Sequence, residues 1–360
     1  MHKKIGVIRG DCSSREIIEQ TLRVLNKVAE ECRAEFEYEP IAMGGDAIDQ
    51  YGHPLPDHEL DKALSCDAVL LGAIGGPKWD TIDPALRPEK GLLALRKGMG
   101  LYSNLRPAKI WKQLADASPL KKSITDQGID FVIVRELTGG VYFGEHKTWE
   151  EDGQRQALDL MPYSEEEIRR IARIGFETAM KRNKKLKLVD KANVLDTSKL
   201  WRTVCREMKD EYPEVDYSEM YVDNCAMQIC KNPAQFDVIL TENMFGDILS
   251  DEASEITGSI GMIPSSSLGD GTRGLYEPIH GSAPDIEGQD LVNPIAGILS
   301  AAMMLRYSFD MEKEAAAIEK AVEKTLDQGW RTADMMSEGM KQAGTRKITD
   351  IILANLILPE

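Results

Sequence analysis

The sequence lacks the features that carry a chain into or across a membrane. No segment approaches the ~20 consecutive apolar residues of a membrane-spanning helix. The N-terminal segment is basic, but Arg9 and Asp11 keep its apolar run shorter than that of a signal peptide. The six cysteines are scattered, with no C-x-x-C pair and no metal-ligand spacing. We therefore expect reduced thiols and a cytoplasmic protein rather than a disulfide framework.

Basic residues are too few to balance the acidic ones. Lys and Arg number 44 against 60 Asp and Glu, which gives a formal net charge of −16. Such a surface repels nucleic acid and anionic membranes, so we expect neither as a partner. It would also repel a dicarboxylate, so an anionic substrate would need a local cluster of arginines.

Common nucleotide and nucleophile motifs are also missing. There is no P-loop and no Gly-x-Ser-x-Gly elbow. Residues 269–274 match G-x-G-x-x-G, but Ser-Ser-Ser precedes them and Tyr-Glu-Pro follows. We expect no strand before this segment and no helix after it, so it predicts a loop rather than a Rossmann fingerprint.

The chain has 360 residues, more than one hydrophobic core usually serves, which predicts two domains. Short apolar runs alternate with helical patterns, and from about residue 294 the pattern is mostly helical. This alternation predicts an α/β fold with a largely parallel sheet. Ser164 and Glu167 form a capping-box signature. The predicted strands are 5–8, 68–73, 131–134, 186–189 and 238–240, and the predicted helices include 14–33, 165–181, 295–304 and 313–326.

Asp247 and Asp251 form the most specific local pattern. They are four residues apart, so on a helix their carboxylates project from one face. Like charges at that spacing repel, and Mg²⁺ or Mn²⁺ held by carboxylates and waters would remove the repulsion. The alternative is a solvated acidic face. The apolar residues Phe245, Ile248 and Leu249 predict a partly buried helix start, which favours the metal site modestly.

Asp223 and Lys191 each follow a predicted strand, where polar residues of open α/β sheets tend to face ligands. Taken alone, Asp223 fits a turn or a helix cap better than a ligand site. Lys191 can serve as a general base in a suitable environment. Its alternative is an exposed basic surface, because residues 181–187 are rich in lysine.

Three arginines, Arg96, Arg106 and Arg135, stand at the ends of predicted elements. The planar guanidinium matches a carboxylate bidentately, so arginines that converge would bind a diacid. The alternative is ordinary surface exposure. Tyr142 follows a glycine turn and can present its phenol as a proton donor, or it can fill a core.

Seven segments together resemble the β-decarboxylating dehydrogenases of the isocitrate/isopropylmalate dehydrogenase family. They follow the family's order across nearly the whole chain, and chance agreement of all of them is implausible. The segments are residues 71–80, 91–96, 104–107, 135–144, 189–194, 245–251 and 280–286.

The resemblance implies a two-domain α/β fold that is mostly parallel and is not a Rossmann domain. It implies a first, cofactor-binding domain built from residues 1–101 and 259–360. Residues 102–258 would form a second domain for metal, substrate and dimerisation. It also implies a homodimer whose active sites draw on both subunits.

The resemblance further implies the roles of individual residues. Asp247 and Asp251, with Asp223 of the partner subunit, would bind Mg²⁺ or Mn²⁺. Lys191 of the partner subunit would help remove the hydroxyl proton while hydride passes to NAD, and Tyr142 would take part in protonating the enol. Assistance by K⁺ stays open. The implied substrate-binding residues are Arg96, Arg106, Arg135, Asp223, Glu89, Leu92 and Leu93.

Two features of the likeness indicate specificity. Glu89, Leu92 and Leu93 match a wall that accepts an isopropyl group, which implies 3-isopropylmalate as substrate. Asp285 suits the ribose hydroxyls of NAD and would repel the 2′-phosphate of NADP. The implied cofactor-binding residues are His280, Gly281, Ser282, Ala283, Pro284, Asp285, Ile286 and Asn293.

One segment departs from the family pattern. The family usually reads Gly-Asp-Gly-Ile-Gly-Pro-Glu after the first strand, whereas this chain reads Gly-Asp-Cys-Ser-Ser-Arg-Glu from residue 10 to residue 16. The loss of two glycines and a proline gives side chains to a loop near the cofactor. Ser13 and Glu16 have capping-box spacing, so we expect the helix start to survive.

Two other hypotheses are open at this point. A related enzyme would act on another 2-hydroxydiacid, such as tartrate, an alkylmalate or homoisocitrate, and only the leucine wall argues against it. A non-catalytic regulatory subunit would have lost chemical residues, yet Tyr142, Lys191, Asp223, Asp247 and Asp251 are all present.

Overall fold

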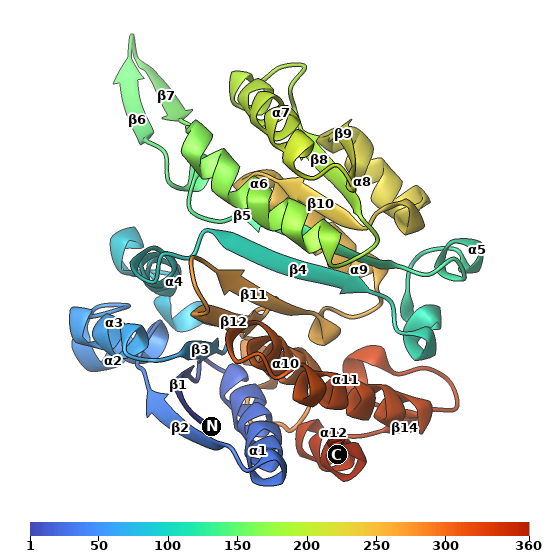
Figure 1. The fold of residues 1–360 in the computed structure, drawn as a ribbon. Coiled ribbons are helices and arrows are strands. Elements are labelled where there is room, and N and C mark those ends of the chain that lie inside the picture. Colours follow the sequence, from blue (N-terminus) through green and yellow to red (C-terminus); the bar gives the residue numbers. More distant parts are fainter. Residues whose placement is uncertain (360) are drawn as a thin grey trace. The chain divides into compact units, whose positions relative to one another are not determined.

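The computed structural model describes residues 1–359, and the chain divides into two compact units. The first unit contains Met1–Leu101, Trp111–Ala117 and the chain from Gly258 onward. The second contains Tyr102–Ile110 and Ser118–Thr257. Both ends of the chain therefore contribute to the first unit, as the colours of Figure 1 show.

The first unit is built on five strands in the order β2-β1-β3-β12-β11. Strand β1 pairs in parallel with β2 and β3, β3 pairs in parallel with β12, and only β11 is antiparallel. All four residues of β3 are buried, as expected for a strand covered on both faces. The strands are β1 (His2–Ile8), β2 (Glu35–Pro40), β3 (Ala68–Leu71), β11 (Pro264–Leu268) and β12 (Gly274–Pro278).

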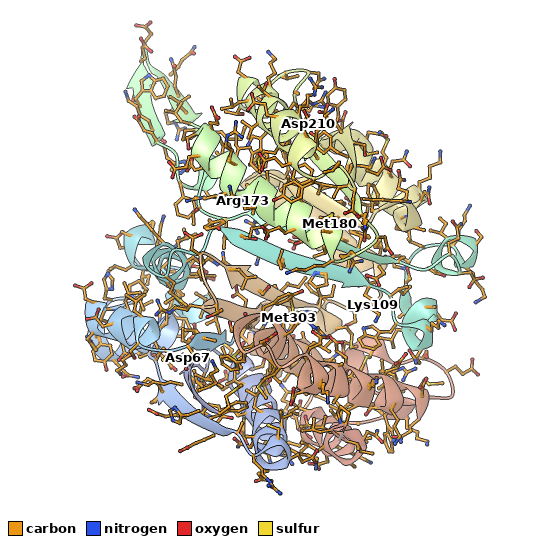
Figure 2. All side chains as sticks on the ribbon, viewed as in Figure 1. Asp67, Lys109, Arg173, Met180, Asp210 and Met303 are labelled. Carbon is orange, nitrogen blue, oxygen red and sulfur yellow. The ribbon has the colours of Figure 1, made fainter. Side chains whose placement is uncertain are left out.

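Helix α10 (Ile295–Ser308) forms the centre of the first unit's helical layer. It is buried along most of its length and contacts β11, β12, α1 and α11; Figure 2 labels its Met303. The other helices are α1 (Ser14–Cys32), α2 (Gly45–Tyr51), α3 (Asp57–Leu64), α4 (Pro88–Gly98), α11 (Glu312–Asp327) and α12 (Thr345–Asn355), beside the short strands β13 (Trp330–Arg331) and β14 (Lys341–Gln342).

The sheet of the second unit also has five strands, in the order β4-β5-β10-β8-β9. Four are parallel, and β4 is antiparallel to β5. A separate antiparallel hairpin is exposed along most of its length. The sheet strands are β4 (Ser103–Lys109), β5 (Asp130–Glu136), β8 (Lys185–Asp190), β9 (Asp216–Tyr221) and β10 (Val238–Thr241); the hairpin strands are β6 (His146–Glu151) and β7 (Gln154–Asp159).

Helix α6 (Glu165–Met180) covers the second unit's sheet and contacts β5, β8 and β10. Its apolar face, including Ile168 and Phe176, is buried, and Figure 2 shows Arg173 on the exposed face. The predicted capping box is confirmed, because Ser164 and Glu167 bond each other's backbone. The remaining helices are α5 (Lys122–Thr125), α7 (Asp196–Met208), α8 (Val222–Lys231) and α9 (Asn243–Ile256).

The predicted α/β class with mostly parallel strands is confirmed, and so are the five predicted strands and four predicted helices, within a few residues. Two local expectations are wrong. A strand, β11, does precede residues 269–274, but the chain then enters the antiparallel β12, so the segment is a hairpin loop. Arg106 lies in the middle of β4, not at its end. No helix among residues 1–359 is long and apolar enough to span a membrane.

Replacement of Ser164 by alanine should destabilise the second unit by about 1 kcal/mol, because the amide of Glu167 at the start of α6 loses its bond to Ser164 Oγ. Chemical denaturation measures the change. Ser123→Ala, at an exposed position in the same unit, is the control and should stay within about 0.5 kcal/mol of the unaltered protein. Equal midpoints for the two variants would contradict the capping role.

Candidate active site

Asp247 and Asp251 lie on α9, as the sequence predicts. The side chain of Glu242 caps this helix by accepting from the amides of Met244 at 3.0 Å and Phe245 at 2.7 Å. The expected burial of the helix start is confirmed for Phe245 and Leu249 and is wrong for Ile248, which is 58% exposed.

Arg106 and Arg135 both reach this aspartate pair. Arg106 Nη1 lies 3.6 Å from Asp247 and 3.3 Å from Asp251, and it donates to Ser250 Oγ at 2.7 Å. Arg135, which is 4% exposed, donates from Nη1 to Asp247. Two of the three predicted arginines therefore converge on one acidic centre.

The pKa values of the two aspartates shift in opposite directions. Burial opposes ionisation of Asp247, but the charges of Arg135 and Arg106 outweigh it and hold the pKa below its usual value. Burial raises the pKa of Asp251, and the charge of Asp247 adds to that effect. Asp247 is therefore the stronger acid of the pair.

Tyr142 completes this cluster. Its hydroxyl donates to Asp247 Oδ2 at 2.9 Å, and Arg135 lies over its ring at 5.8 Å. Partial burial, followed by the negative charge of Asp247, raises the pKa of the phenol. Tyr142 is 41% exposed, so it does not fill a core. It presents a protonated phenol beside the acidic centre.

Lys191 and Asp223 form a second cluster in the same unit. Lys191 follows β8, Asp223 lies in the first turn of α8, and their charged groups are 3.0 Å apart. The hydrogen bond from Lys191 lowers the pKa of Asp223. The backbone amide of Lys191 is held by Ser198 Oγ at 3.1 Å.

Asp223 does not join Asp247 and Asp251 within one chain. Over the described part of the molecule, no three His, Cys, Asp or Glu side chains gather in a way that would hold a metal ion. Oxygen ligands of Asp247 and Asp251 suit a hard divalent cation, yet one chain brings only two of the three predicted ligands together.

A buried polar network, missed by the sequence analysis, supports Arg135. Asn243 Oδ1 accepts from Arg135 Nε at 3.0 Å and Nη2 at 2.7 Å, and Asn243 Nδ2 donates to Gly139 O at 3.0 Å. The hydroxyl of Tyr163 accepts from the amide of Asn243 at 3.0 Å and donates to Glu242 at 3.2 Å. The network thus joins Arg135 to the glycine turn before Tyr142.

A second carboxylate, that of Glu136, lies against the same phenol. Its Oε2 is 3.4 Å from the hydroxyl of Tyr163 and accepts from the amide of Gly139 at 2.8 Å. Burial raises the pKa of both Glu136 and Glu242. The only sequence signal for this network was that Glu242 and Asn243 directly precede the aspartate motif.

Arg96 and the predicted apolar wall belong to the first unit. Arg96 is buried in the last turn of α4 and donates from Nη2 to Glu277 at 2.6 Å. Its Nε is buried without a partner. Leu92 and Leu93 are half-buried on the same helix, and Glu89 is exposed in its first turn.

The predicted cofactor loop also belongs to the first unit. His280 Nδ1 lies 2.9 Å from Gly281 O, and because a carbonyl only accepts, Nδ1 carries the proton. His280 Nε2 is buried without a partner, and burial lowers the pKa of the ring. Asp285 is exposed on the 3₁₀ turn Pro284–Ile286.

The remaining predicted cofactor residues follow the same loop. Ala283 has a left-handed backbone with φ 43°. Asn293 is buried, and its side chain is hydrogen-bonded within the protein. It donates to Asp334 at 3.0 Å and accepts from the amide of Ile295 at 3.0 Å. Gly281 and Pro284 are exposed, Ser282 is buried and Ile286 is half-buried.

The atypical turn before α1 keeps a glycine-like backbone without glycine. Cys12 has φ 51°, in the left-handed region. Buried Asp11 fixes its surroundings by accepting from the amides of Gly45 at 3.0 Å and Gly75 at 2.7 Å. The predicted capping box of Ser13 and Glu16 is wrong: Ser13 makes no side-chain cap bond, although α1 still begins at Ser14.

These residues fail to cap α1 because both bond elsewhere. Ser13 Oγ donates to Ser282 O at 2.6 Å, and Glu16 Oε1 accepts from the amide of Gly288 at 2.6 Å. Each side chain therefore bonds a residue distant in the sequence instead of an amide of α1.

The chain belongs to the isocitrate/isopropylmalate dehydrogenase family, whose model matches residues 4–352. Among its curated relatives are proteins named 3-isopropylmalate dehydrogenase. That of Aquifex aeolicus is 56% identical over 98% of this chain and 97% of its own length. That of Helicobacter hepaticus is 56% identical over 99% of this chain and 100% of its own. The resemblance inferred from the seven sequence segments is confirmed.

Solved structures agree with this family. Isocitrate dehydrogenase from Methylococcus capsulatus matches with a TM-score of 0.85 at 30% identity, covering 99% of both chains. A β-decarboxylating dehydrogenase from Thermococcus kodakarensis matches with a TM-score of 0.80 at 36% identity, covering 98% of this chain and 96% of its own.

Replacement of Tyr163 by phenylalanine should lower the stability of the second unit by about 1–3 kcal/mol, because a buried amide and two buried carboxylates lose their shared partner. Urea denaturation measures this change. Tyr51→Phe, at an exposed ring, should change stability by less than about 0.5 kcal/mol. Equal stability of the two variants would show that the network contributes nothing.

Proposed function

We propose that this protein is a 3-isopropylmalate dehydrogenase. It oxidises the hydroxyl of (2R,3S)-3-isopropylmalate with NAD⁺ and releases CO₂, yielding 4-methyl-2-oxopentanoate in leucine biosynthesis. The observation that carries this proposal is the convergence of Arg106, Arg135 and Tyr142 on Asp247. The choice of substrate rests on relatives named 3-isopropylmalate dehydrogenase, which are 54–56% identical over nearly the whole chain.

The arginines overcome the charge of the whole molecule. With a net charge of −16, the surface repels a dicarboxylate at long range. Arg106 and Arg135 would bind a substrate carboxylate through guanidinium groups that match its geometry, and Arg96 is proposed for the same role. Leu92 and Leu93 would receive the isopropyl group, and Glu89 is proposed on the same wall.

The donor set fits a divalent metal. Asp247 and Asp251 offer carboxylate oxygens, and the lowered pKa of Asp247 keeps it ionised and ready to bind. We assign Asp247 and Asp251, with Asp223 of the partner subunit, as ligands of Mg²⁺ or Mn²⁺. The metal, when bound, supplies charge stabilisation for the ketone and enolate oxygen.

Lys191 and Tyr142 would move the protons. Lys191 of the partner subunit would help remove the proton of the substrate hydroxyl. NAD⁺, when bound, would supply the acceptor for the hydride of the carbon that bears this hydroxyl. The bond to the β-carboxylate then breaks and CO₂ departs. Tyr142 protonates the remaining enol at carbon, and its raised pKa keeps the phenol protonated at neutral pH, as a proton donor requires.

The loop of residues 280–293 fits the adenosine part of NAD. His280 Nε2 is a buried acceptor without a partner, which suits a donor such as the adenine amino group. Exposed Asp285 suits ribose hydroxyls and opposes a 2′-phosphate. We therefore assign cofactor binding to the first unit, and metal binding, substrate binding and dimerisation to the second.

A second copy of the chain would complete the active site. One chain brings together two of the three proposed metal ligands. The second unit also exposes three large apolar side chains, one between β8 and α7, one on α8 and one on α9: Val194 at 65%, Met227 at 61% and Ile248 at 58%. A homodimer would cover these side chains and bring Asp223 and Lys191 of each subunit to the other's aspartate pair. A cytoplasmic location stays a prediction, consistent with six unpaired cysteines.

Turnover measurements test the proposal. NADH formation is followed with 3-isopropylmalate and Mg²⁺ or Mn²⁺, beside malate, tartrate, homoisocitrate and isocitrate. We expect rapid turnover of isopropylmalate with NAD⁺, little with NADP⁺, and loss of activity in EDTA. Turnover of another diacid but not of isopropylmalate would contradict the substrate assignment. No turnover of any of these diacids would favour a regulatory subunit.

Mixed dimers test the shared active site. Asp223→Asn and Asp247→Asn should each be nearly inactive alone. In a co-refolded equal mixture, half of the dimers carry both variants, and each such dimer regains one intact site, so about a quarter of the original activity should return. No recovery in a mixture shown by mass spectrometry to contain heterodimers would mean that each site belongs to one chain.

A further inference from the structure

The start of α1 holds the proposed cofactor loop at two points. The carbonyl of Ser282 accepts from both the hydroxyl of Ser13 at 2.6 Å and its backbone amide at 3.1 Å. Six residues further along, the amide of Gly288 donates to Glu16 Oε1 at 2.6 Å. We call Ser13 and Glu16 the clasp.

The first point of the clasp is shielded from water. Ser13 is 1% exposed and Ser282 is 7% exposed. The hydroxyl of Ser282 is also fixed, donating to Gly75 O at 2.7 Å. The Ser13 hydroxyl therefore adds a second buried hydrogen bond to the one made by the Ser13 amide, and together they constrain this end of the loop.

The segment between the two points has little internal structure. It holds a single 3₁₀ turn, with Ile286 N to Ala283 O at 3.4 Å and Gln289 N to Ile286 O at 3.3 Å. Such long bonds are weak. Asp285 lies in this segment, and its carbonyl accepts from Gln289 Nε2 at 2.8 Å. The two anchored ends add to this hold on its position.

We propose that Ser13 and Glu16 are positioning residues that order the 282–288 segment before NAD arrives and thereby raise the affinity for the cofactor. The inference rests on the proposed role of residues 280–293 in binding adenosine. Ordering the loop in advance removes a conformational cost from binding. Because Asp285 is the group held in place, the clasp also sharpens the preference for NAD over NADP.

A role for these side chains in capping α1 does not fit the geometry. Ser13 has helical backbone angles, φ −66° and ψ −13°, and makes no side-chain cap bond. A capping serine instead has an extended backbone and accepts from a helix amide. Glu16 likewise accepts from Gly288, in a loop far along the chain.

Four variants test the proposal. Ser13→Ala and Glu16→Ala each remove the side-chain oxygen of one clasp contact. Ser14→Ala is a matched control, since Ser14 is the next residue, is also buried, and its hydroxyl has no partner. Glu19→Ala controls for the loss of a glutamate side chain at an exposed position of α1.

Two readouts separate positioning from folding. In the cofactor-free protein, hydrogen exchange of the 282–288 segment should speed up in both clasp variants and stay unchanged in both controls. Calorimetric titration should show NAD binding weakened about fivefold for each clasp variant, the loss expected for one net hydrogen bond. The turnover number at saturating NAD should be retained.

The outcomes are distinguishable. Unaltered protein that binds no NAD would overturn the proposed function, and this inference with it. Normal binding by the unaltered protein with clasp variants no weaker than their controls would overturn the inference alone. Should Ser13→Ala fail to fold, Glu16→Ala decides, because its contact is at the surface.

Discussion

The repulsion between two carboxylates one turn apart on α9 is the constraint around which the second unit is arranged. Asp247 and Asp251 would weaken their own helix if left alone. Arg106 and Arg135 lie against them, and both arginines come from the antiparallel pair β4 and β5. The guanidinium groups offset the like-charge repulsion. Both oxygens of Asp247 accept hydrogen bonds, from Arg135 and Tyr142, and each keeps a further lone pair for a cation.

That arrangement depends on a polar core beneath it. Arg135 is buried, and a buried cation is tolerated only when its donors are satisfied. Asn243 takes two of those donors, and Tyr163, Glu136 and Glu242 hold Asn243 and the adjoining glycine turn. The same contacts therefore fix the arginine, the start of the aspartate helix and the turn that presents the phenol.

Most of the fold could be predicted from the sequence, because buried parallel strands and amphipathic helices have distinct apolar periods. The aspartate pair was also predictable, since both residues lie on one helix. The Tyr163 network was not, because its members come from separate segments joined only by tertiary contacts. The capping box before α1 failed for a related reason: spacing identifies a possible local bond, but Ser282 and Gly288 offered Ser13 and Glu16 other partners.

The left-handed backbone at Cys12 has a consequence for how such proteins are recognised. A residue with a side chain in that backbone region is less stable than glycine by on the order of 1 kcal/mol. The turn keeps this conformation in spite of that cost, and the neighbouring Asp11 is held by the amides of Gly45 and Gly75. The shape of the turn has thus become independent of the residue that most favours it. A motif search that requires glycine at this position would pass over the chain, although the backbone still follows the path that glycine would take.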